Sequence, residues 1–182
     1  MKNYKLSDET KTLPCGTVLH RVVATTTFTL ACEITINAGD VGGWIEKESN
    51  LSGGAWVSDN AMVYDNAQVY DKALVSDNAE VCGNALVCGC AHVSGNAQVS
   101  GDAWVHRNAQ VYGNVHVFGN AHVSSNAQVY GDAWVAGKAL VRDNAHVSGD
   151  AKVCGDAQIY GDAEVSGGAK ISGDAKIMNA SD

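Results

Sequence analysis

From residue 51 to residue 177, an aliphatic residue occupies every sixth position of this chain without a break. The series consists of Leu51, eighteen valines between Val57 and Val165, and Ile159, Ile171 and Ile177. An alanine follows four residues after each member from Leu51 to Ile171, with Val115 as the only exception among twenty-one positions. A period of six fits neither a helix nor a plain alternating strand, but it fits a short strand followed by a two-residue corner.

The alanine and the next aliphatic residue are two positions apart, so both point to the same side of a strand. Three such strands close a triangular coil of eighteen residues, and the twenty-two units give about seven coils stacked along one axis. A prism this narrow holds one branched aliphatic side chain and one methyl group per side. The pattern therefore predicts an all-β fold, a triangular parallel β-helix over residues 51–182.

The two residues between successive strands suit this fold as well. Pairs such as Asp59-Asn60, Gly83-Asn84 and Gly161-Asp162 tolerate a positive φ angle or satisfy turn backbone groups with a short side chain. The only proline, Pro14, lies outside the repeat. Its position is consistent with the prediction because a proline would remove a hydrogen bond between neighbouring coils.

With these features the repeat resembles the hexapeptide-repeat proteins, a group that includes many acyltransferases and the γ-class carbonic anhydrases. The resemblance covers residues 51–177. It implies a left-handed coil and, as is usual in that group, a homo-oligomer with a trimer favoured. It implies little about activity, because one fold supports many functions.

Residues 1–50 lack the six-residue period and contain β-rich runs at Thr17–Val23 and Phe28–Ile36. We expect a small β cap here, since the open end of a β-helix exposes unpaired backbone groups. The segment Gly42-Gly43-Trp44-Ile45-Glu46 leads into the repeat. It resembles the corresponding segment of stand-alone hexapeptide-repeat proteins of bacteriophages and prophages, which implies a phage or prophage origin.

The formal net charge is −8, and residues 51–182 contain fourteen acidic and seven basic side chains. This balance disfavours direct binding to nucleic acid. Most of the acids occupy corners, where turn chemistry and solubility account for them. A second interpretation is that the acids imitate a nucleic-acid backbone and occupy a basic cleft of a partner. Calcium binding is disfavoured because the corners lack a dense set of oxygen ligands.

We expect the six cysteines to be free thiols in a cytoplasmic protein, because the N-terminal residues contain no apolar signal segment or membrane span. Cys82, Cys88 and Cys154 occupy outward positions where serine and tyrosine also occur. The sequence Cys88-Gly89-Cys90 is too short and isolated for a zinc pair. No metal site and no cofactor are predicted.

Hexapeptide-repeat acyltransferases use a loop that leaves the coil and a catalytic histidine, but this repeat contains no insertion. His92, His116, His122 and His146 precede inward residues, and His106 follows one, so all five point outward. No two of them are eighteen residues apart, and only a trimer would gather three around zinc as in a γ-class carbonic anhydrase. No catalytic residue is predicted; an acyltransferase-like or carbonic-anhydrase-like enzyme is the alternative.

Two groups of large outward side chains remain. The candidate partner-binding patch lies at one corner and consists of Tyr112, His116, Phe118, Tyr130 and Trp134. The candidate oligomer face has eighteen-residue spacing and consists of Leu86, Trp104, His122 and Leu140. Large apolar side chains outside the channel have no core to join, so they are candidate interface anchors.

The sequence thus favours a non-enzymatic, rigid protein-binding module of phage or prophage origin. The expected partner is a host or defence protein that the module inhibits, and no membrane contact is expected. A structural, self-assembling module is a further alternative.

Overall fold

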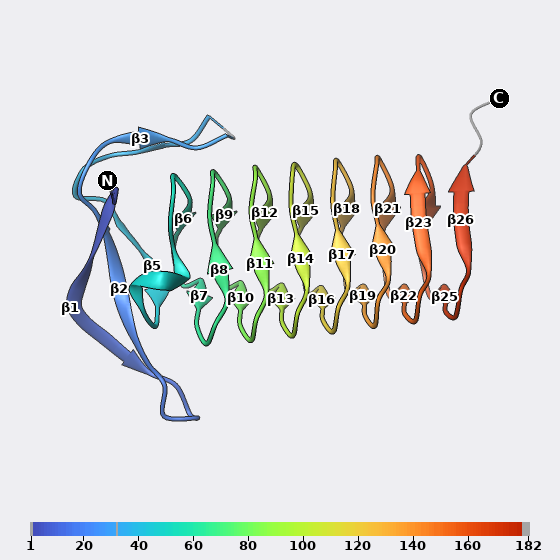
Figure 1. Cartoon of the computed structure of the whole chain (residues 1–182), viewed down its shortest axis with the longest axis horizontal. Coiled ribbons are helices and arrows are strands. Elements are labelled where there is room, and N and C mark those ends of the chain that lie inside the picture. The colour runs from blue at the N-terminus through green and yellow to red at the C-terminus, as the bar shows by residue number, and fades with distance from the viewer. Residues whose placement is uncertain (1, 32, 180–182) are drawn as a thin grey trace.

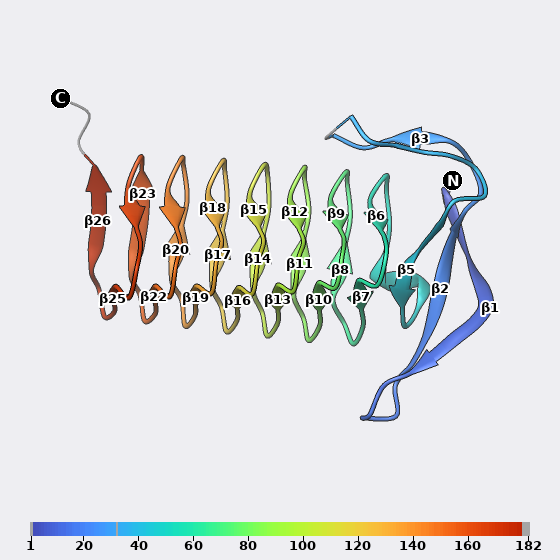
Figure 2. The same ribbon diagram turned by 180° about the vertical axis from the view of Figure 1, so that it is seen from behind.

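The computed structural model describes residues 2–31 and 33–179 and shows a row of stacked β coils with an N-terminal cap at one end (Figure 1). Three sheets form the sides of the coils, and strands of successive coils pair in parallel within each sheet. Seen from behind, the same coils follow one another in unbroken order to the C-terminal end (Figure 2). The predicted all-β, parallel β-helical fold is confirmed, and the hand of the coil stays a prediction.

The three sheets are called face 1, face 2 and face 3. Face 1 contains β1 (Tyr4–Thr12), β2 (Val18–Ala24), β5 (Val41–Ile45), β7 (Met62–Val63), β10 (Glu80–Val81), β13 (Gln98–Val99), β16 (His116–Val117), β19 (Trp134–Val135), β22 (Lys152–Val153) and β25 (Lys170–Ile171). Face 2 contains β8 (Gln68–Val69), β11 (Leu86–Val87), β14 (Trp104–Val105), β17 (His122–Val123), β20 (Leu140–Val141), β23 (Gln158–Gly161) and β26 (Lys176–Asn179). Face 3 contains β6 (Trp56–Val57), β9 (Leu74–Val75), β12 (His92–Val93), β15 (Gln110–Val111), β18 (Gln128–Val129), β21 (His146–Val147) and β24 (Glu164–Val165).

Neighbouring coils pair with a step of eighteen residues on each face. On face 1, for example, Val81 pairs with Val99 and Val99 pairs with Val117. The backbone hydrogen bonds of these ladders run along the long axis of the rod, as from Cys82 N to Val99 O at 3.0 Å. Each internal strand therefore has its backbone groups satisfied on both sides.

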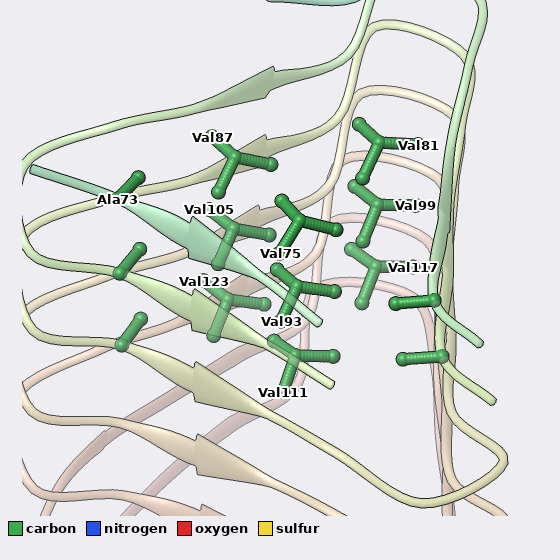
Figure 3. Close-up of a cluster of buried hydrophobic side chains, with 14 of the residues drawn as sticks. Ala73, Val75, Val81, Val87, Val93, Val99, Val105, Val111, Val117 and Val123 are labelled. Atoms are coloured by element: carbon green, nitrogen blue, oxygen red, sulfur yellow. The ribbon is translucent and has the colours of Figure 1, made fainter. Parts of the chain in front are cut away.

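The channel inside the three faces is filled by the periodic residues (Figure 3). Val81, Val87 and Val93, one from each face, are all 0 % exposed. The alanines that precede them are at most 1 % exposed, and the exceptional Val115 is 0 % exposed. Close packing of a narrow prism explains why the sequence repeats small and branched residues here rather than large ones.

The first residue of every corner from residue 53 to residue 173 has a positive φ angle. Glycine occupies most of these positions, and five aspartates, Arg107 and Ser125 occupy the others. The aspartates offset the cost of this conformation, because each accepts a backbone N–H from the next coil; Asp77 Oδ2 lies 2.9 Å from Gly95 N. Turn chemistry therefore accounts for these acids.

The second corner residue forms a ladder of its own. Asn96 Nδ2 donates to Asn114 Oδ1 at 2.9 Å, and Asn114 Nδ2 donates to Asp132 Oδ1 at 2.7 Å. Two other ladders, ending at Asp102 and Asp162, have the same direction. Each ends at an aspartate because a carboxylate accepts hydrogen bonds but has no N–H to pass on.

The N-terminal cap joins the coils through β5. This strand pairs antiparallel with β2 and parallel with β7, where Ile45 lies opposite Val63. Ile45 is six residues before Leu51, so parallel pairing begins before residue 51 and the rod has about eight turns, one more than the sequence predicts. The two glycines of the lead-in segment are sterically required, because a Cβ at Gly43 would lie 2.6 Å from Ala61 O.

Between β5 and the first repeat unit, the 3₁₀ turn η1 (Glu48–Asn50) replaces an ordinary corner. Asn50 is fully buried there, and its Nδ2 donates to Ala67 O at 2.8 Å. The Tyr4 hydroxyl donates to Leu51 O at 2.7 Å, and burial raises the pKa of Tyr4 to about 12. These satisfied polar groups attach the cap to the channel end.

A short hairpin of β3 (Phe28–Thr29) and β4 (Thr35–Ile36) extends from the cap over β6 and β9 (Figures 1 and 2). The continuous β-rich run expected at residues 28–36 is thus two strands with a reversal between them, and Cys32 lies outside the described residues. The ring of Phe28 meets that of Trp56 edge-on at 5.8 Å, and both Trp56 and Leu74 are buried. The hairpin therefore covers the first coils of face 3. No helix in residues 2–31 and 33–179 has the length and apolar character needed to cross a membrane.

Candidate binding surfaces

Each strand of the rod presents two outward side chains, one before and one after the inward valine. Eighteen-residue pairing stacks these positions into two columns per face. A side chain in one column therefore contacts its counterparts on the coils before and after it.

The predicted partner-binding patch is divided by the structure into two clusters. The first lies on face 3, where the rings of Tyr112 and Tyr130 stack at a centroid distance of 5.2 Å and an interplanar angle of 3°. His146, on the next coil, meets Tyr130 edge-on at 6.5 Å. Burial raises the pKa of Tyr112, which favours its neutral phenol.

The second cluster lies on face 1 and centres on Trp134, whose side chain is 41 % exposed. His116 lies 5.0 Å from the Trp134 ring, and Phe118 meets it edge-on at 5.8 Å. Lys152, on the following coil, places its ammonium 5.0 Å from the ring centroid. This cluster therefore carries its own cation.

The prediction of one corner patch was too coarse. The two clusters flank the corner at residues 113–114 and 131–132, and within residues 2–31 and 33–179 no ring contact joins them across it. The physical reason is that side chains on either side of a corner project from different faces of the prism. Their use in binding a partner stays a prediction.

The predicted oligomer face is a continuous column on face 2. Leu86 pairs with Trp104, Trp104 with His122, and His122 with Leu140, in the expected register. The Trp104 side chain is 42 % exposed and contacts His122 at 5.3 Å and His106 at 5.9 Å. Burial, with Arg107 and His122 nearby, lowers the pKa of His106 and favours its neutral form. Whether this column mediates self-association stays a prediction.

The structure also pairs Ser76 with His92 on face 3, a contact that the sequence reading missed. Ser76 Oγ lies 3.0 Å from His92 Nε2, and burial lowers the pKa of His92, although Asp77 acts in the opposite direction. The two residues are sixteen positions apart, the spacing of diagonal neighbours on successive coils. A search at this spacing would have found them.

The Ser76–His92 pair lacks a site for a developing oxyanion. Nearby backbone N–H groups already have acceptors: Asn78 N donates to Gly95 O at 2.9 Å and Ala79 N donates to Ser76 O at 3.2 Å. A nucleophilic serine requires such donors to stabilise its tetrahedral intermediate. The geometry therefore fits a structural hydrogen bond better than a catalytic pair.

Two of the outward thiols, Cys82 and Cys88, also contact neighbouring polar side chains. The Tyr64 hydroxyl donates to Glu80, and it also lies against the Cys82 thiol; burial raises the pKa of both Tyr64 and Cys82. Burial likewise raises the pKa of Cys88, beside Tyr70. A raised thiol pKa disfavours the reactive thiolate.

Within residues 2–31 and 33–179, no group of three or more His, Cys, Asp or Glu side chains is placed to hold a metal ion. A shallow hollow of about 510 Å³ lies at a corner between faces 2 and 3, lined by Gly53, Gly54, Asp71, Lys72, Gly89 and Cys90. It exists because small residues occupy that corner on alternate coils.

Comparison with known proteins agrees with the fold. A family model described as the YdcK beta solenoid repeat matches three segments of the chain, residues 55–71, 91–107 and 109–125. A search of curated proteins gives no match. The chain is thus a repeat β-helix protein, similar over these segments to the YdcK beta-solenoid repeat. The phage resemblance of the segment Gly42–Glu46 stays a prediction.

Proposed function

We propose that this protein is a non-enzymatic, rigid rod that binds another protein through the aromatic clusters on faces 1 and 3. The observation that carries the proposal is the concentration of Tyr112, Tyr130 and Trp134 on two successive coils outside the channel. The fold does not require them, since other coils have serine, glutamine or lysine in the same columns. Exposed aromatic side chains are the residues in which binding free energy concentrates.

The rigidity of the rod supports this function. Backbone ladders run through consecutive coils, and the inward side chains of the middle coils are fully buried. The clusters are therefore held in fixed positions before a partner arrives. Such preorganisation lowers the entropic cost of association.

A binding role also agrees better with the chemistry of the surface than the enzymatic alternative does. The six-residue period from residue 51 to residue 177 leaves no room for a loop that would close over a substrate. The Ser76–His92 pair, the nearest approach to a catalytic arrangement, lacks an oxyanion site. An acyltransferase-like or carbonic-anhydrase-like activity is accordingly the less supported reading.

The lead-in segment Gly42–Glu46 supports a phage or prophage origin, and we propose a host or defence protein as the inhibited partner. Imitation of nucleic acid is less well supported, because aspartates such as Asp65 and Asp77 already accept backbone hydrogen bonds. We assign the column Leu86, Trp104, His122 and Leu140 to self-association, in a trimer by resemblance, because oligomers commonly bury such a strip.

The test is capture of a partner from host lysate on immobilised protein, followed by identification and rebinding of the purified partner. The double substitution Tyr130→Ala with Trp134→Ala should abolish rebinding and leave the β spectrum unchanged, since neither side chain is in the channel. A matched control, Ser52→Ala with Gln68→Ala, changes two exposed residues away from the clusters. Rebinding by the double variant at parental affinity would contradict the proposal.

A further inference from the structure

The second outward column of face 3 contains two tyrosines among serines. Its members, from the capped end onward, are Ser58, Ser76, Ser94, Tyr112, Tyr130, Ser148 and Ser166. Tyr112 and Tyr130 cover one face of each other's rings. Ser148 follows Tyr130 in this column. It lies on the next coil, where Val147 O accepts a hydrogen bond from Tyr130 N at 2.9 Å. A serine is too small to cover a phenol ring, so the column leaves space over Tyr130, next to the edge-on contact with His146 at 6.5 Å.

The two ends of the tyrosine pair differ in charge. The corner residues two positions after Ser94 and Tyr112 are Asn96 and Asn114. The corresponding residues after Tyr130 and Ser148 are Asp132 and Asp150, both exposed. Asp132 accepts from Asn114, whereas Asp150 has no side-chain hydrogen bond or ion pair with residues 2–31 and 33–179. The space over Tyr130 is thus bordered by carboxylates, and the space beside Tyr112 is not.

The chain itself shows what fits such a space. In the second outward column of face 2, Arg142 lies one coil from Tyr160, with its guanidinium carbon 4.6 Å from the ring centroid. Arg142 Nη1 also lies 3.0 Å from Asp143 Oδ2 at the adjoining corner. This arginine is therefore held by a tyrosine ring one coil away and by an aspartate at the adjoining corner. Tyr130 and its corner aspartates supply the same groups with two differences: Ser148, the residue in place of the arginine, is one coil after the ring rather than one before it, and Asp132 and Asp150 are second rather than first corner residues.

We infer that the surface formed by Tyr130, Ser148, Asp132 and Asp150 binds an arginine side chain of the partner protein. Arginine fits better than lysine because its planar guanidinium stacks on an aromatic ring while donating to a carboxylate. The net charge of −8 favours a partner with a basic surface. The inference rests on the proposed protein-binding function and assigns the chemistry of the partner.

Trp134, across the corner, is a less suitable site because Lys152 already lies over its ring. Trp44, in the cap, is likewise covered by Arg21 at 4.6 Å. Trp104 has His106 and His122 beside it. Tyr130 has the imidazole of His146 edge-on at 6.5 Å, but no lysine or arginine of residues 2–31 and 33–179 lies over its ring, and exposed aspartates follow both Tyr130 and Ser148 at the corner.

The test uses a labelled peptide of about ten alternating arginine and glycine residues, whose binding to the whole protein is followed by fluorescence anisotropy. Ser148→Arg fills the space from within and should weaken binding about tenfold or more, the loss expected for one stacked and ion-paired arginine. Ser94→Arg adds the same charge at the other end of the tyrosine pair and should change the affinity by no more than about twofold. If both variants lose the same amount of affinity for the peptide, net charge alone explains the loss and the inference is wrong.

A second pair of variants tests the carboxylates. Asp132→Asn with Asp150→Asn should weaken binding of the arginine peptide, whereas Asp156→Asn with Asp174→Asn removes the same charge at a corner without tyrosines and should not. A lysine and glycine peptide of equal length should bind more weakly than the arginine peptide. Absence of binding at low ionic strength, or equal affinity for the two peptides, would overturn the inference.

The outcome is separable from that of the proposed function. If Tyr130→Ala with Trp134→Ala abolishes binding of the purified partner but Ser148→Arg does not, the aromatic surface binds a protein without an arginine at this position. In that case the proposed function stands and the inference fails. If neither variant affects the partner, both fail.

Discussion

The channel and the outer surface of this rod follow opposite rules. Inside, the same two side-chain types recur on every face, and they are fully buried in the middle coils. Outside, the column that contains Trp104 also contains glutamine, leucine, histidine and lysine. The difference shows that the fold constrains one side of each strand and leaves the other side available for function.

The corners lie between these two regimes. They must adopt a positive φ angle, which restricts the first residue, yet they face solvent, which permits a charge. The aspartates at this position meet both conditions, because their carboxylates accept a backbone N–H from the next coil. A corner substitution should therefore have an effect between those of the channel and of the surface.

The strongest test of this contrast places a charge on each side of one strand. Val99→Asp should destabilise the rod by more than about 3 kcal/mol, because the carboxylate would enter a dry channel without a partner. Gln98→Asp, one residue earlier and exposed, should change the free energy of unfolding by no more than about 0.5 kcal/mol. Chemical denaturation measures both. A loss below about 1 kcal/mol in Val99→Asp would mean that the channel is wetter or wider than described.

At a corner, Gly83→Ala should cost about 1–2 kcal/mol, because alanine must take up the φ angle of 69°. Its Cβ would also lie 3.0 Å from Gly101 N. Gly83→Asp should cost less, because the carboxylate can accept the Gly101 N–H as Asp65 accepts that of Gly83. Chemical denaturation of the two variants measures their difference in stability. If Gly83→Asp is less stable than Gly83→Ala, the proposed role of the corner aspartates is contradicted.

The sequence predicted the coil well because the packing that produces the coil depends on residues within each short strand. One branched side chain and one methyl group per strand fill the channel, so period six and the alanine position sufficed to place the three faces. Ile45 was missed because Ser49 stands where alanine belongs and η1 replaces the corner. The hairpin of β3 and β4 was missed because its reversal depends on contacts with face 3, such as that of Phe28 with Trp56.

The candidate surface was only partly predictable. Eighteen-residue spacing placed Trp104 above Leu86 and Tyr130 above Tyr112 correctly. Sequence spacing alone did not separate Tyr112 from His116, which are four residues apart but project from different faces. Diagonal contacts such as that of Ser76 with His92 follow a spacing of sixteen residues, and the sequence-based prediction considered only stacked positions eighteen residues apart.

Substitutions on the outer surface should alter assembly while leaving the fold intact. Trp104→Glu with Leu140→Glu should convert the proposed oligomer into a monomer, because the charges would have to be buried in the proposed self-association strip. Sedimentation velocity measures the change, and circular dichroism checks the β structure. An unchanged oligomer would exclude this strip and direct attention to the cluster around Trp134.

The smallest effect concerns His92, an outward residue that is partly buried. Because burial lowers its pKa in the folded protein, the unfolded chain binds a proton more readily, and stability should fall as the pH drops through the ordinary histidine value of about 6.5. His92→Gln removes the titrating group and should flatten this part of the pH profile in urea denaturation. Ser76→Ala should leave most of the slope in place, since burial rather than the hydrogen bond to Ser76 is the main cause. If both variants flatten the pH dependence of stability equally, the hydrogen bond between Ser76 and His92 is its cause. His92 would then belong with the buried polar contacts rather than with the outer surface.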